Sequence, residues 1–172
     1  YDYSSYASAY ISGDVTVIDH MYAKAYGNYS STYLTMDGTT TFDSTDIHVR
    51  AVGDYSSAFL DVQDAQGTIN SIHVHGEYHT VASAFISGDV TVSDRVLVHA
   101  WGNDSSAYLT LDGTTTFDST DVVVNSWSDI ASEAFLTVYN AQGHINSLDI
   151  ATGATDGYYG AYYTFGNYAS AY

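Results

Sequence analysis

A long internal repeat constrains the fold of this chain more than any other feature of its sequence. Residues 11–17 (ISGDVTV) return unchanged at 86–92, and residues 37–46 (DGTTTFDSTD) return unchanged at 112–121, so the offset is 75 in both cases. Self-similarity at a fixed period indicates units stacked on one another. We therefore expect a single domain over residues 1-172. It contains repeat units of approximately 10-84 and 85-161 and a Tyr-rich C-terminal segment, 162-172.

A shorter period lies inside the long one. A step of a small, an aromatic and an aliphatic or aromatic residue recurs at intervals between 23 and 27. Its aromatic residues are Tyr10, Tyr33, Phe59, Phe85, Tyr108, Phe135 and Tyr162. The spacing predicts a parallel β-solenoid (β-helix) of about seven coils, in which these rings form one outward ladder. The ladder would stiffen the sheet or serve as a lateral interface. The alternative, an antiparallel β-sandwich, gives no reason for the shorter period.

The alternation of side chains agrees with an all-β fold. Between residues 107 and 117, one parity contains Ala107, Leu109, Leu111 and Phe117, whereas the other is mostly polar. A strand with one buried face has this pattern, so we expect the first parity to face the core. The chain has no proline, which paired strands exclude.

Charge and composition exclude several classes of protein. The chain has 20 acidic and 3 basic residues, a net charge of −17 at pH 7, and we expect no nucleic-acid binding. It has no cysteine, which removes disulfides and thiolate chemistry, and no long apolar run for membrane insertion. Lys24, Arg50 and Arg95 fall on different predicted coils, and no catalytic motif is recognisable. We expect no enzymatic activity.

Tyrosines crowd both ends of the chain, and residues 168–172 (YASAY) repeat residues 6–10. A solenoid end exposes an unpaired strand edge unless a cap covers it, and neither end has an amphipathic helix. Three interpretations remain: a window of a longer array, self-capping ends, or ends that bind each other. The third gives an open filament. Its predicted interface is Tyr1, Tyr3, Tyr6, Tyr10, Tyr158, Tyr159, Tyr162, Tyr163, Tyr168 and Tyr172.

Other ligand signals are weak. We expect no cofactor. The duplicated aspartates are explained by turns, where aspartate side chains hydrogen-bond nearby backbone groups. The alternative is weak Ca²⁺ binding, for which the candidate ligands are Asp43, Asp46, Asp118 and Asp121. None of the histidines is duplicated in the long repeat, which argues against a repeated metal site. Asn28 and Asn103 begin glycosylation sequons at equivalent positions. Outward threonines that could bind ice recur in only two coils.

With its repeated coils, aspartate-rich turns and lack of cysteine, the chain resembles β-helical repeat regions of prokaryotic surface adhesins and extracellular filament proteins. The resemblance is architectural and implies an extracellular or cell-surface location. The sequence begins at Tyr1 without a signal-peptide pattern, so we expect a mature or excised form. We predict a structural subunit of an extracellular filament or matrix, with copies of itself as partners. The alternative is an adhesin stalk or binding segment that recognises surface glycans or calcium.

Overall fold

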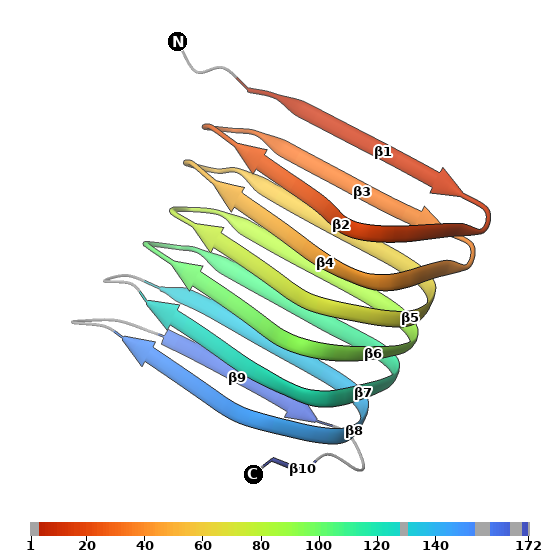
Figure 1. Ribbon diagram of the computed structural model, residues 1–172. Coiled ribbons are helices and arrows are strands. Elements are labelled where there is room, and N and C mark those ends of the chain that lie inside the picture. The colour runs from red at the N-terminus through yellow and green to blue at the C-terminus, as the bar shows by residue number, and fades with distance from the viewer. Residues whose placement is uncertain (1–3, 128–130, 154–158, 166–169, 172) are drawn as a thin grey trace.

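Each interval of the shorter period forms one coil, and the coils stack to make a parallel β-solenoid of about six turns (Figure 1). The computed structural model describes residues 4–127, 131–153, 159–165 and 170–171, and the side chains of residues 4–127 and 131–151. The predicted fold class is confirmed, although the complete turns number about six instead of seven. At about 4.8 Å per coil, six turns span roughly 29 Å.

The strands follow one another in a simple order. The first coil contains β1 (Tyr6–Ser12) and β2 (Val15–Tyr26), and the second contains β3 (Ser31–Asp37) and β4 (Thr40–Val52). Each of the next four coils is one long, bent strand: β5 (Ser57–Glu77), β6 (Val81–Trp101), β7 (Ser106–Trp127) and β8 (Ser132–Gly153). The chain ends with β9 (Tyr159–Phe165) and β10 (Ser170–Ala171).

The coils form two walls that enclose the core. We call β1, β3, the N-terminal parts of β5–β8 and β9 the first wall, and β2, β4 and the C-terminal parts of β5–β8 the second wall (Figure 1). All pairing between coils is parallel. The offset between paired residues varies slightly: Tyr6 pairs with Ser31, Ser31 with Ser57, and Ser57 with Val81.

Alternate residues of both walls point inward and fill the space between them. Leu109, Leu111 and Phe117 are each 1% exposed, so the predicted core parity is confirmed there. In the second wall, the buried column contains Met21, Ile47, Ile72, Val96 and Val122. Burial of an aliphatic side chain of this size contributes about 1.5–3 kcal/mol, and dispersion between stacked coils adds to it.

Two kinds of corner turn the chain between walls and between coils. Gly38 has φ +117°, and a Cβ placed there would lie 2.7 Å from the carbonyl oxygen of Gly13 in the coil above. Only glycine fits such a close backbone approach at positive φ. Where one coil passes to the next, a buried hydroxyl closes the turn: Ser56 Oγ donates to Gly53 O at 2.9 Å. The described part of the chain contains no helix, and thus none that could cross a membrane.

Candidate assembly and ligand surfaces

The N-terminal coil has an open strand edge. Within the described residues, β1 pairs only with β3 and β2 only with β4, whereas β5, β6 and β7 are paired on both sides (Figure 1). All residues of β1 are exposed, including Tyr6 at 71% and Tyr10 at 65%. Ile18 of β2 is 68% exposed. This end therefore presents backbone hydrogen-bonding groups beside apolar side chains.

The predicted C-terminal half of the assembly interface is only partly within the described residues. Tyr159, Tyr162 and Tyr163 lie in β9, which pairs with the N-terminal part of β8. The remaining predicted residues lie outside the described parts: Tyr1, Tyr3, Tyr158, Tyr168 and Tyr172. That the N-terminal tyrosines of one copy contact the C-terminal tyrosines of the next copy stays a prediction.

The prediction of one continuous aromatic ladder is wrong at two coils. The residues that share a column are Tyr33, Phe59, Ser83, Tyr108, Phe135 and Tyr162, with Ser8 opposite Tyr33 in the first coil. Tyr10 lies opposite Thr35, and Phe85 lies between Asp61 and Thr110, which places both in the next outward column. The cause is the varying offset between coils, which moves a ring to the next outward position while keeping it on the outer face.

A second set of stacked rings follows the turns between coils. Tyr29 stacks on Tyr55 with ring centroids 5.3 Å apart, and Tyr55 stacks on His79 at 5.5 Å. His79 also lies between two carboxylates, with Nδ1 3.3 Å from Asp54 Oδ1 and Nε2 3.5 Å from Asp104 Oδ2. The sequence carries a signal for this set, because the residue before the buried serine or threonine is aromatic in three successive turns, as Tyr29, Tyr55 and His79.

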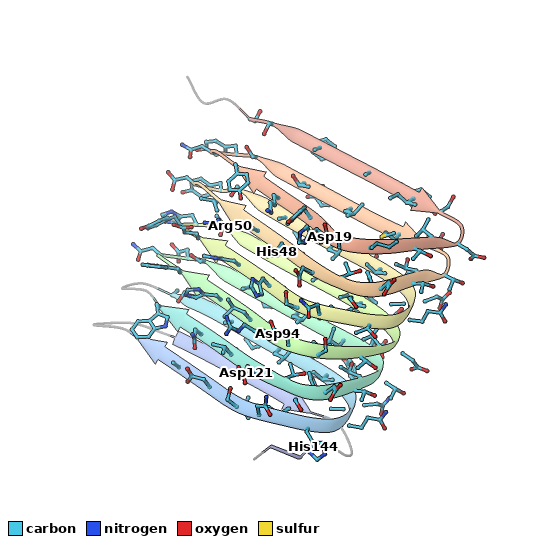
Figure 2. The ribbon with its side chains drawn as sticks, viewed as in Figure 1. Asp19, His48, Arg50, Asp94, Asp121 and His144 are labelled. Atoms are coloured by element: carbon cyan, nitrogen blue, oxygen red, sulfur yellow. The ribbon has the colours of Figure 1, made fainter. Side chains whose placement is uncertain are left out.

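The second wall gathers basic and imidazole side chains on its outer face. Lys24 pairs in register with Arg50, Arg50 with His75, and His75 with His99. In the neighbouring column, His48 pairs with His73, and their ring centroids are 4.9 Å apart. Figure 2 labels His48 and Arg50 on this wall. The long repeat gives no sign of this convergence, because it relates every third coil, whereas the contacts form between adjacent coils.

These histidines are poor bases in the folded chain. Burial, together with the positive charges of His99 and Arg50, lowers the pKa of His75 to about 4 against the opposing effect of Glu77. Burial is also the main reason that the pKa values of His48, His73 and His99 are lowered. Arg50 is paired with Glu77 at 3.2 Å. The face is therefore mostly neutral imidazole at pH 7 and takes up protons in acid.

A hollow of about 150 Å³ lies on this face, lined by Lys24, His48, Arg50, His73, His75 and Leu97. It contains no convergent set of metal ligands. Among the described residues, no group of three or more histidine, aspartate or glutamate side chains could hold a metal ion.

The candidate Ca²⁺ ligands lie where β4 and β7 bend in the second wall. Asp46 Oδ1 accepts hydrogen bonds from Ser71 Oγ at 2.7 Å and Asn70 Nδ2 at 2.9 Å. Burial raises the pKa of Asp46, but these hydrogen bonds and His20 outweigh it, so that the pKa lies below its ordinary value. Asp121 Oδ1 accepts a hydrogen bond from Ser147 in the same way, whereas Asp43 and Asp118 are exposed. These contacts are side-chain ladders between coils.

The two sequons lie in turns between coils. Asn28 is exposed and Asn103 is half-buried. The serine of each sequon is buried, with Ser30 Oγ donating to Tyr26 O at 2.9 Å and Ser105 Oγ donating to Gly102 O at 2.7 Å. Glycosylation stays a prediction.

Comparison with known proteins gives no relative for this fold: no family model matches the chain, and no curated protein or solved structure is significantly similar to it.

Proposed function

We propose that the chain is a structural subunit of an extracellular filament, in which copies stack head to tail. The observation that carries this proposal is the open edge of β1 and β2, where the parallel pairing that continues through β8 stops at the N-terminal coil. An unpaired, exposed edge is a template for another strand. The extracellular location rests on the resemblance described above.

The hydrogen bonds of β1 indicate which backbone groups are open. Ser5 O accepts from Ser31 N–H at 2.8 Å, and Gly13 N–H donates to Asp37 O at 2.9 Å. In a parallel ladder, alternate residues point both backbone groups to the same side. The N–H groups of Ser8 and Tyr10 therefore face the open edge, where a strand from another copy would accept them.

The side chains of the first coil also support stacking. Ile11 is 38% exposed, whereas Ile86, which the long repeat places at the position of Ile11, is 1% exposed beneath another coil. An incoming coil would bury Ile11 as β5 buries Ile86. At the other end of the stack, β9 pairs with the first-wall part of β8 and β10 with its second-wall part, so the C-terminal coil of an incoming copy would present parallel strands to both β1 and β2.

The proposal is tested by blocking each end separately. Ser8→Pro removes one open-edge N–H without removing a donor used by β3, and the matched control Ser8→Thr retains that N–H. A second variant lacks residues 166–172. We expect both Ser8→Pro and the truncation to lower the sedimentable polymer at least fivefold while each monomer keeps its thermal unfolding midpoint within a few degrees. Polymer yield equal to that of the unmodified chain from both variants contradicts end-to-end stacking.

A second candidate function, a glycan-binding segment, is favoured by one surface. Trp101 and Trp127 pair in register, are 52% and 49% exposed, and with His99 line a hollow of about 290 Å³. Exposed indole rings stack on the apolar faces of sugars. Titration with neutral oligosaccharides, followed by tryptophan fluorescence, tests this function. Trp127→Leu should abolish a saturable signal, with Trp101 as the remaining reporter; no signal from the unmodified chain removes this candidate.

A further inference from the structure

The first wall has a column of rings on its outer face that is interrupted at one coil. Tyr33 stacks on Phe59 with ring centroids 5.0 Å apart, and Tyr108 stacks on Phe135 at 5.4 Å. Between the two pairs the column contains Ser83, which lies opposite Phe59 on one side and Tyr108 on the other. Two coil spacings are about 9.6 Å, so the missing ring leaves room for one planar group stacked on both neighbours.

The first coil shows how the chain fills an equivalent vacancy. The long repeat relates Ser8 to Ser83, and Ser8 lies opposite Tyr33 as Ser83 lies opposite Tyr108. In the first coil the ring of Tyr6, which precedes Ser8 on the same face, reaches Tyr33 with centroids 5.7 Å apart. The residue that corresponds to Tyr6 in the fourth coil is Val81, which has no ring to offer. The ring of Tyr6 thus fills the vacancy at Ser8, whereas no corresponding ring fills the vacancy at Ser83.

A hollow of about 310 Å³ opens on the Phe59 side of Ser83, away from Tyr108, and is lined by Tyr33, Leu34, Thr35, Phe59, Leu60, Asp61, Ser83 and Phe85. Three of the eight lining residues are aromatic, and one, Asp61, carries a carboxylate. Gln63 Nε2 donates to Asp61 Oδ1, which leaves the second carboxylate oxygen for a ligand. The chain's net charge of −17 attracts cations and repels anions over a longer range.

We propose that this gap, the Ser83 slot, binds a planar aromatic cation. The flat ring stacks between Phe59 and Tyr108, where the quadrupoles of both rings favour a positive charge, and the cationic group faces Asp61. The slot lies within one chain on the outer face of the first wall, so its occupation does not depend on the proposed assembly.

Thioflavin T, a planar aromatic cation, is the probe, and fluorescence titration of the full chain is the measurement. Val81→Tyr supplies the ring that Tyr6 supplies in the first coil, and Val81→Thr is the matched control without a ring. Ser83→Phe fills the column directly and keeps the test valid if Val81→Tyr fails to fold, which circular dichroism reports. Sedimentation on each sample separates binding at the slot from a change in polymer yield.

We expect saturable binding of one thioflavin T per chain. Val81→Tyr or Ser83→Phe should weaken it at least tenfold, Val81→Thr less than twofold, and Asp61→Asn severalfold. The slot is overturned if the unmodified chain shows no saturable binding. It is also overturned if Val81→Tyr and Ser83→Phe both bind thioflavin T with the affinity of the unmodified chain. Equal affinity in Asp61→Asn overturns the assignment of a cation.

Discussion

The imidazole rings of His75 and His99 stack on adjacent coils with their centroids 4.9 Å apart. Protonation of either ring places a positive charge against the other, in a half-buried position beside Arg50. The unfolded chain lacks this constraint, because its histidines are solvated and separated. The histidine face thus couples folding to proton uptake.

We predict that acid destabilises the fold through these histidines. The pKa of His75 falls from 6.5 in the unfolded chain to about 4 in the folded chain, so below pH 6.5 the unfolded state binds the proton more readily. The stabilisation is complete above pH 6.5 and is lost as pH falls toward 4. For His75 alone, the loss is about 2 kcal/mol in the free energy of unfolding, measured by urea unfolding at pH 7.0 and pH 4.5.

The matched variant for this prediction is His75→Asn, because Asn125 occupies the same column two coils later. The variant should reduce the difference in unfolding free energy between the two pH values by about 1–2 kcal/mol. His20→Asn, at a more exposed position of the same wall, is the control for general effects of losing an imidazole. An unchanged pH difference in His75→Asn contradicts the account.

Gly38 and Gly13 provide a test of the close approach between coils. Both have positive φ, but a Cβ at Gly38 meets the backbone of Gly13 at 2.7 Å, whereas a Cβ at Gly13 meets nothing within 4 Å. Gly13→Ala should cost about 1 kcal/mol from backbone strain, and Gly38→Ala about 3 kcal/mol or more. Denaturant unfolding measures both. Equal losses would mean that the coil spacing relaxes around the added methyl group.

Two equivalent serine–aspartate hydrogen bonds join adjacent coils in the second wall, one with a buried serine and one with an exposed serine. Ser71 Oγ donates to Asp46 at 2.7 Å, with Ser71 6% exposed, and Ser147 Oγ donates to Asp121 at 2.8 Å in an exposed setting. Ser71→Ala should lower the free energy of unfolding by about 1–2 kcal/mol at pH 7, and Ser147→Ala by less than about 0.5 kcal/mol. Because the pKa of Asp46 is lowered by folding, the Ser71 effect should shrink as pH falls below about 4.

The stacked pair of Tyr33 and Phe59 can be tested by a double-mutant cycle with leucine. Their centroids are 5.0 Å apart with planes at 11°, and we expect a coupling free energy of about 0.5–1.5 kcal/mol. A parallel cycle on Phe59 and Phe85, which lie in different columns, should give less than about 0.5 kcal/mol. Similar coupling in the two cycles would show that shared apolar burial, and not ring stacking, supports the outer face.

The fold was predictable from sequence because the repeat and the alternation act together. Residues such as Leu109 and Val122 recur at inward positions, and a β-solenoid is the architecture in which each coil buries its inward face against its neighbours. The register was not predictable, because offsets that vary between coils move Tyr10 and Phe85 out of the aromatic column. The histidine face was missed because His75 and His99 are separated by one coil, whereas the long repeat spans three.

The central claim is that copies stack through the open edge of β1 and β2. Electron microscopy of the purified, unmodified chain at about 0.15 M salt, where charge repulsion is screened beyond about 8 Å, tests it most directly. The account predicts unbranched filaments with strands across the axis, a meridional reflection near 4.8 Å and a longer axial repeat of about one subunit, roughly 29–34 Å. Discrete particles of single-chain size at all protein concentrations would contradict it.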